Sequence, residues 1–287
     1  MTLDEVRAGL RAARYITTPR VETALFLALA LEKPLLAEGP AGAGKTELGK
    51  VLAQLLDTEL VRLQCYEGLD EARALFEWNY QKQLLRIQAD RGGWEDVSTH
   101  IFSREFLLER PLLRAIVAPR RVVLLIDEVD KADPEFEAFL LEVLSDFQVS
   151  VPELGTIAAR HRPAVVLTSN RTRELSEALV RRCLHLYVDF PGAEKEAEIV
   201  ALKVPELDER LRVQVARFVS GLRKLELKKA PSIAETLDWA RALRALQIRE
   251  LTPAAVRQTL NLVLKHEEDI RKAEGKLSGL LASATKA

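Results

Sequence analysis

A glycine-rich stretch at residues 35–50, LLAEGPAGAGKTELGK, constrains the fold more than any other part of the chain. A short apolar run comes before the glycines, and an amphipathic helical pattern follows them. The spacing of glycines, lysine and threonine is typical of a loop whose backbone N–H groups surround a phosphate at the start of a helix. Lys45 would bring a positive charge to the outer phosphates, and the Thr46 hydroxyl would bind magnesium. The predicted cofactor-binding residues of this loop are Gly39, Pro40, Ala41, Gly42, Ala43, Gly44, Lys45, Thr46 and Glu47.

Five patterns predict strands, each a short apolar run separated from the next by helical sequence. They lie at residues 34–38, 60–65, 122–126, 164–170 and 184–188. The third and fourth are continuously apolar, as expected for parallel strands that are covered on both faces. We therefore predict a three-layer α/β sandwich around a five-stranded parallel sheet.

The composition changes near residue 190, after which we find helical patterns and no strand. This predicts a nucleotide-binding α/β domain at 1–190 and a small all-helical domain at 191–287. The tail at 275–287 is expected to fray.

Composition restricts the classes of function. Apolar residues make up 48% of the 287 residues, and 42 lysines and arginines balance 43 acidic residues to a net charge of −1. No overall field would draw such a chain to nucleic acid or an anionic membrane, and no apolar run approaches the ~20 residues of a membrane span. We expect a cytoplasmic protein in which Cys65 and Cys183 are buried thiols, without a structural metal.

Two adjacent acids, Asp127 and Glu128, end the apolar strand at 122–126. Burying neighbouring carboxylates is costly unless a cation or a reaction requires them. Because the carboxyl ends of parallel strands face the ligand, these acids should meet the phosphates held by Lys45 and Thr46. We predict that Asp127 holds magnesium and that Glu128 orients the attacking water.

The next predicted strand ends at Asn170, whose neutral amide could contact the γ-phosphate or the water without adding repulsion. After it, Arg181 and Arg182 end a short helical pattern. Arginines near a helix C-terminus are favoured by its dipole, which would explain them without any function. The alternative is an arginine finger that stabilises transition-state charge in a neighbouring subunit.

The segments GPAGAGKT, LLIDEVDKAD, TSN and SEALVRRC, in this order and followed by a helical domain, closely resemble the AAA+ ATPases and, within them, the MoxR group. Residues 63–88 look like those of MoxR-type chaperones for the maturation of molybdenum-containing carbon monoxide dehydrogenase. The resemblance implies an ATP- and Mg²⁺-dependent P-loop ATPase that forms a ring, usually a hexamer. It also implies a von Willebrand factor A-type partner and a metalloenzyme client.

The same resemblance assigns roles by position. Asn170 corresponds to the first sensor, Arg182 to the finger with Arg181 as the second choice, and Tyr15 with Ile16 to an adenine contact, although that pair could equally be core. One departure concerns the second sensor, usually an arginine at the start of a lid helix. That place holds Ala234, and Arg241 is either its substitute or a solvated arginine.

Two inserted segments are candidates for contact with a client. Residues 68–88 predict one helix with an apolar stripe through Tyr80 and Leu84 and with Trp78 on a second face. That second face is either buried inside the subunit or available to another molecule. Residues 148–162 predict a β-hairpin that resembles the presensor hairpin of the same clade.

Two other classes of function compete with an ATPase chaperone. AAA+ cores also serve in motors and loaders that act on nucleic acid, since a fold does not fix a function. A nucleotide-gated scaffold with little turnover is the other, because the second-sensor position lacks its arginine.

Overall fold

The structure, a computed structural model, describes residues 1–89, 101–152 and 154–285. Internal contacts divide the chain into two units. The first comprises Met1–Gly39 and Lys45–Tyr187, and the second comprises Pro40–Gly44 and Val188–Ala287.

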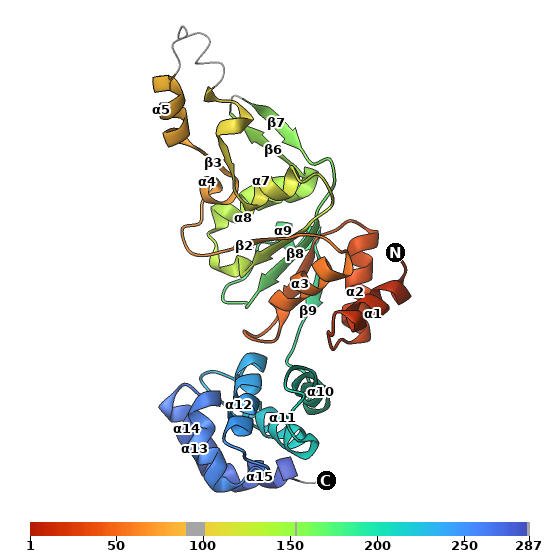
Figure 1. The fold of residues 1–287 in the computed structure, drawn as a ribbon, viewed down its shortest axis with the longest axis vertical. Coiled ribbons are helices and arrows are strands. Elements are labelled where there is room, and N and C mark those ends of the chain that lie inside the picture. The colour runs from red at the N-terminus through yellow and green to blue at the C-terminus, as the bar shows by residue number, and fades with distance from the viewer. Residues whose placement is uncertain (90–100, 153, 286–287) are drawn as a thin grey trace. The chain divides into compact units, whose positions relative to one another are not determined.

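The first unit is built on a five-stranded sheet in the order β2-β5-β8-β1-β9, with every neighbouring pair parallel (Figure 1). The strands are β1 (Leu35–Glu38), β2 (Leu60–Gln64), β5 (Val123–Asp127), β8 (Ala164–Ser169) and β9 (Leu184–Tyr187). Every residue of β5 and β8 is buried. The predicted parallel sheet is therefore confirmed, and each predicted run supplied one of its strands.

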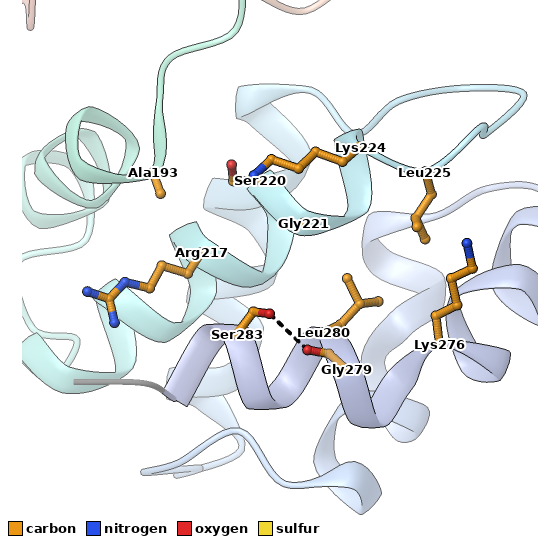
Figure 2. Close-up of a pocket in the computed structure, with 10 residues that line it drawn as sticks. All are labelled: Ala193, Arg217, Ser220, Gly221, Lys224, Leu225, Lys276, Gly279, Leu280 and Ser283. Carbon is orange, nitrogen blue, oxygen red and sulfur yellow. Dashed lines mark hydrogen bonds between the residues drawn. The ribbon is translucent and has the colours of Figure 1, made fainter.

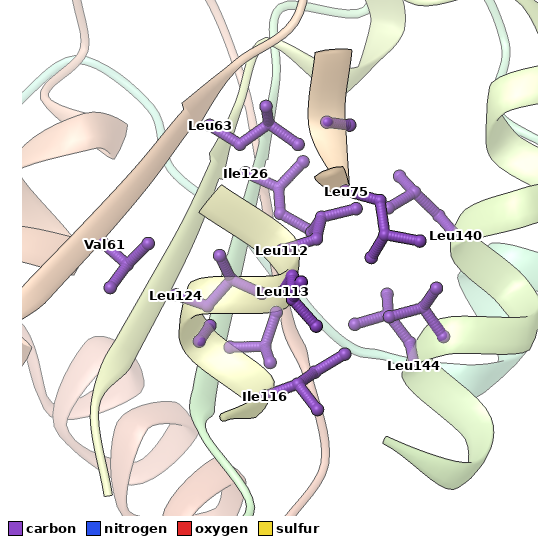
Figure 3. Close-up of a cluster of buried hydrophobic side chains, with 14 of the residues drawn as sticks. Val61, Leu63, Leu75, Leu112, Leu113, Ile116, Leu124, Ile126, Leu140 and Leu144 are labelled. Carbon is purple, nitrogen blue, oxygen red and sulfur yellow. The ribbon is translucent and has the colours of Figure 1, made fainter. Parts of the chain in front are cut away.

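Helices cover both faces of this sheet. They are α1 (Leu3–Ala12), α2 (Pro19–Ala30), α3 (Lys45–Leu55), α7 (Pro111–Ile116), α8 (Pro134–Asp146) and α9 (Glu177–Arg182), with the 3-10 turn η2 (Val129–Lys131) after β5. A Cβ on Gly49 of α3 would lie only 3.1 Å from the side chain of Leu125, so α3 packs closely on that side of β5. Leu124 and Ile126 belong instead to the cluster formed with α7 and α8 (Figure 3). Alternation along β5 thus produces the three layers.

The segment after β2 corrects one prediction. It contains α4 (Glu71–Ala74), β3 (Phe76–Trp78) and α5 (Tyr80–Ala89), followed by η1 (Arg104–Phe106) and β4 (Leu107–Glu109), so a single helix over 68–88 was wrong. The helical pattern breaks because Phe76–Trp78 pairs antiparallel with Leu107–Glu109, about thirty residues further on. A pairing over that distance overrides local periodicity.

The structure decides between the two alternatives for Trp78 and corrects the apolar stripe. Trp78 packs edge-on against Phe76 and Phe102, with ring centroids 6.1 and 5.5 Å away. Tyr80 and Leu84, placed on the core stripe by periodicity, are 63% and 58% exposed. The most exposed apolar side chains of this segment, among the described residues, are therefore on α5, whereas Trp78 is half-buried.

A β-hairpin precedes β8. Strands β6 (Gln148–Val151) and β7 (Gly155–Ala158) pair antiparallel, with Val149 opposite Ile157. Val149 and Val151 are buried in the same core as β5, which anchors the base of the hairpin. Gly155 has φ +75°, a conformation that glycine adopts without strain.

The second unit contains six described helices. They are α10 (Ala193–Lys203), α11 (Glu209–Arg223), α12 (Ile233–Ala245), α13 (Pro253–Val263), α14 (Glu267–Gly275) and α15 (Leu277–Thr285). Their core surrounds Phe218 and Trp239, whose ring centroids are 5.4 Å apart. The tail, which was expected to fray, is helical up to Thr285, because Leu277, Leu280 and Leu281 are buried in that core. None of the described helices is long and apolar enough to cross a membrane.

Candidate active site

The glycine loop joins β1 to α3, which begins at Lys45. Gly42 and Gly44 have φ values of +80° and +92°, so a side chain at either position would strain the backbone. This is the conformational freedom that a phosphate cradle requires. The contacts of the loop with phosphates remain a prediction.

Lys45 is buried, and its ammonium group binds polar groups at the edge of the sheet. Its Nζ atom donates to the carbonyl oxygen of Gly39 at 2.9 Å and to Oδ1 of Asn170 at 2.8 Å. Burial lowers the pKa of Lys45, and the charges of Asp130, Asp127 and Glu128 partly offset this effect. The residues that the sequence assigned to phosphate and sensor functions therefore lie in direct contact.

Asp127 receives hydrogen bonds from several elements. Thr46 Oγ1 donates to Oδ1 at 2.9 Å, and Thr168 Oγ1 donates to the same oxygen at 2.6 Å. Arg62 pairs with the other oxygen at 2.5 Å. A carboxylate beside a hydroxyl is the oxygen donor set that Mg²⁺ prefers, so Thr46 and Asp127 fit the predicted metal site.

Glu128 has a left-handed backbone, with φ 57° and ψ 49°. Its carboxylate accepts hydrogen bonds from Gln64 Nε2 at 2.9 Å and from Asn170 Nδ2 at 3.2 Å, and it pairs with Lys131 at 2.6 Å. The amide of Asn170 thus bridges Lys45 and Glu128, accepting from one and donating to the other. Such an amide can sense a change at either group.

The backbone beside Asn170 is fixed by Asp130. The N–H groups of Asn170 and Thr172 donate to its two carboxylate oxygens at 3.1 and 2.9 Å, and the Thr172 hydroxyl adds a bond of 2.6 Å. Burial alone would raise the pKa of Asp130, but the hydrogen bonds from Thr172 and Asn170 outweigh it, so the pKa is lowered. Asp130 is therefore a charged anchor for the loop after β8.

Sequence reasoning did not assign several polar residues of this site, among them Arg62, Gln64, Thr168 and Asp130. Arg62 and Gln64 occupy alternate, outward positions on β2, where Gln64 pairs in register with Asp127. The Arg62 guanidinium also donates to Gln64 Oε1 at 2.6 Å. The available signal was the alternation of LVRLQ, which places both polar side chains on one face of the strand.

The two candidate finger arginines lie away from these groups. They precede β9, whose first residue Leu184 pairs with Leu35, the first residue of β1, so they are at the amino edge of the sheet. Arg181 is exposed and pairs with Glu177, whereas Arg182 donates to the Ser145 hydroxyl at 2.8 Å. Neither reaches the carboxyl edge of its own sheet.

The remaining predicted residues have varied surroundings. Tyr15 and Ile16 are half-buried between α1 and α2, and burial, followed by the charge of Glu47, raises the pKa of Tyr15 to about 12. In the second unit, Ala234 is exposed and Arg241 pairs with Asp238 at 2.9 Å. Cys65 and Cys183 are free thiols, and burial raises the pKa of each to about 12.

Comparisons with known proteins agree with this geometry. The model of the AAA domain of the dynein-related subfamily matches residues 34–183. An uncharacterized protein of Staphylococcus aureus is 25% identical over 251 residues, covering 83% of this chain and 87% of its own length. The chaperone protein ClpB 2 of Parasynechococcus marenigrum is 34% identical over 169 residues, which are 58% of this chain and 16% of that protein.

Solved structures resemble the fold. A mutant of Thermotoga maritima RuvB aligns with a TM-score of 0.52 at 18% identity, covering 99% of this chain and 82% of that one. A second mutant of the same protein aligns with a TM-score of 0.51 at 16% identity, covering 92% and 78%. At these identities the likeness concerns the fold alone. With the matched domain covering residues 34–183 and containing the glycine loop, the acidic strand end and Asn170, the chain belongs to the dynein-related subfamily of AAA domains and is an AAA+ ATPase.

Proposed function

We propose that this ATPase is a remodelling chaperone of the MoxR type, which uses ATP hydrolysis to change the conformation of a partner protein. The contact of Lys45, Asn170 and Glu128 carries the hydrolytic part of the proposal. The apolar surface on α5 carries the remodelling part, because a solvent-exposed apolar face on an inserted segment is suited to contact with another protein.

Each polar residue of the site has a proposed task. Lys45 binds the outer phosphates, and Glu128 orients and polarises the attacking water. Asn170 couples phosphate binding at Lys45 to the position of Glu128, because its amide is hydrogen-bonded to both residues. Thr46 and Asp127 hold Mg²⁺, which neutralises the charge that develops on the phosphate oxygens.

We further propose that the finger acts between subunits of a ring, as in a hexamer. The position of Arg182 at the amino edge of the sheet supports this, since the Lys45 side chain is at the carboxyl edge. Arg182→Ala should lose turnover, and mixing with Glu128→Gln subunits should restore part of it at composite interfaces. Absence of any rescue would favour a structural role for Arg182, which already bonds Ser145. Arg181→Ala tests the second choice, and loss of turnover there with normal turnover in Arg182→Ala would assign the finger to Arg181.

The proposed client-binding elements are α5 and the β6–β7 hairpin. Tyr80, Leu84 and Leu85 are 63%, 58% and 66% exposed on one short helix. The segment 63–88 also carries the resemblance to maturation factors of molybdenum-containing carbon monoxide dehydrogenase. The proposed client is therefore a metalloenzyme of the molybdenum hydroxylase class, with a von Willebrand factor A-type protein as partner.

An affinity experiment tests the client assignment. Tagged Glu128→Gln protein, held with ATP, should retain a molybdenum hydroxylase or a von Willebrand factor A-type protein from the native host. The same bait carrying Leu84→Ser and Leu85→Ser should release it. Retention that does not depend on ATP, or that survives the α5 substitutions, would contradict the proposal.

Steady-state ATPase assays separate the competing functions. DNA-stimulated turnover would favour a nucleic-acid motor, a class to which the net charge of −1 lends no support. Negligible turnover in the unmodified chain would favour the nucleotide-gated scaffold. That function is compatible with the exposed Ala234 at the position where the second sensor is usually an arginine.

A further inference from the structure

The second unit contains a cavity of about 600 Å³ between α11 and α15, beside the start of α10 (Figure 2). It is an open groove, because several of its lining residues are exposed. The lining residues are Ala193, Arg217, Ser220, Gly221, Lys224, Leu225, Lys276, Gly279, Leu280 and Ser283. None of them belongs to the ATPase site described above.

Two matched stripes of sequence form this groove. Arg217, Ser220 and Gly221 on α11, with Lys224 at its C-cap, have the spacing i, i+3, i+4, i+7, and Lys276, Gly279, Leu280 and Ser283 repeat that spacing from the residue before α15 onward. Cations stand at both ends of the first stripe and at the first position of the second, and the middle positions of each stripe include a glycine. A Cβ on Gly221 would lie 2.9 Å from Leu280, so this glycine allows the helices to approach, whereas a Cβ on Gly279 would meet nothing within 4 Å. The hollow exists where Gly279 leaves space unfilled.

The charge of the groove differs from that of the whole chain. Arg217, Lys224 and Lys276 line it, and among the lining residues that the structure describes none is acidic. The chain as a whole balances 42 basic with 43 acidic residues. A local excess of positive charge over a hollow attracts a ligand of negative charge.

The arrangement of the cations restricts the shape of that ligand. Arg217 and Lys224 are seven residues apart on one helix, a rise of about 10 Å, so they do not converge on a single phosphate. No aromatic ring that could stack a nucleobase is among the described lining residues. Leu225 and Leu280 instead provide an aliphatic surface within the groove.

We propose that the groove between α11 and α15 binds an acidic segment of a partner protein. Carboxylates of the segment pair with Lys224 and Lys276, and an aliphatic side chain packs on Leu225 and Leu280. Its lining residues are not among those of the ATPase site or of α5, and the proposal stands whether or not the chaperone function holds.

Fluorescence anisotropy of the full chain tests the proposal with a defined probe, a fluorescein-labelled peptide that alternates pairs of Glu with Leu. The peptide should bind saturably, more weakly as salt rises, and a version with Gln in place of Glu should not bind. The double variant Lys224→Glu, Lys276→Glu should bind about tenfold more weakly. The matched control, Arg249→Glu with Arg257→Glu, changes the same charge on exposed positions outside the groove and should bind like the parent.

A steric variant tests the hollow without altering charge. Gly279→Leu fills space in which a Cβ meets no atom, so it should preserve the circular dichroism spectrum and ATP turnover while blocking the peptide. The proposal is overturned if Gly279→Leu binds as well as the parent, or if the control pair weakens binding as much as the groove pair. Tighter binding of single-stranded oligothymidine than of the acidic peptide would assign the groove to a nucleic-acid backbone instead.

Discussion

Buried charges occur in both units of the chain, but their surroundings differ. In the first unit, Lys45 begins α3 and Asp127 ends β5, and Asp127 is shared among Thr46, Thr168 and an Arg62 that is 49% exposed. In the second unit, Glu196 is fully buried among helices. Two nitrogens of Arg223 bind its two oxygens at 2.5 and 2.8 Å, and the Thr236 hydroxyl donates at 2.7 Å.

This difference separates a reactive site from a structural one. The first network borders solvent through Arg62 and draws on α3, β2, β5 and β8, so its partners can exchange when a ligand arrives. The second joins α10, α11 and α12 inside a core, and Arg223 also stacks on Phe190 at 4.2 Å. Substitutions in the first should change chemistry with little cost in stability, and substitutions in the second should do the reverse.

The largest expected effect is on turnover. Glu128→Gln removes the proposed base but keeps a similar shape, so ATP hydrolysis should fall by about 10²–10⁴-fold. Binding of a fluorescent ATP analogue should stay within a few-fold of the parent. Normal turnover in this variant would remove Glu128 from the proposed mechanism.

The next effect concerns stability of the second unit. Glu196→Ala leaves the Arg223 charge buried without its carboxylate and should lower the free energy of unfolding by about 3–5 kcal/mol. Combining it with Arg223→Met should recover much of the loss, because burying neither charge avoids their desolvation. Urea denaturation measures both variants, with the exposed Glu194→Ala on the same helix as control. An equal loss in Glu194→Ala would contradict the comparison.

Asp130→Asn should have an intermediate effect that depends on pH. Loss of the charged acceptor for Thr172 and Asn170 should cost about 1–3 kcal/mol at neutral pH. Because folding lowers the pKa of Asp130, its stabilisation is complete above the pKa of the unfolded chain and is lost as pH falls through the lower folded value. The free energies of unfolding of parent and variant should therefore converge at acidic pH. A difference that persists there would show that the charge of Asp130 is not the cause.

The smallest effect is expected at Arg241. Its described ion pair is with Asp238 on the exposed face of α12, so Arg241→Ala should change stability by no more than about 0.5 kcal/mol. Nucleotide affinity should also stay near that of the parent. A marked loss of ATP affinity would instead identify Arg241 as the substitute for the second sensor.

The sequence predicted the structure best where a local apolar pattern leads directly to a polar residue of the site. Continuous apolar runs predicted β5 and β8, and at their carboxyl ends Asp127 lies in contact with Thr46 and Asn170 with Lys45. The contributions of Arg62 and Gln64 could not be predicted, because they depend on the register between β2 and β5. The end of the helical pattern at Phe76 could not be predicted either, because it depends on pairing with β4, which lies about thirty residues further along the chain.

The left-handed backbone at Glu128 has a consequence for the evolution of the chain. Glycine and asparagine tolerate this conformation better than glutamate does, so the carboxylate is retained at a cost of about 1 kcal/mol. Selection for heat resistance alone would tend to replace this acid. On the proposed role of Glu128, a glycine there would relieve the backbone and lose the group that orients the water, so stability and turnover place opposite demands on this position.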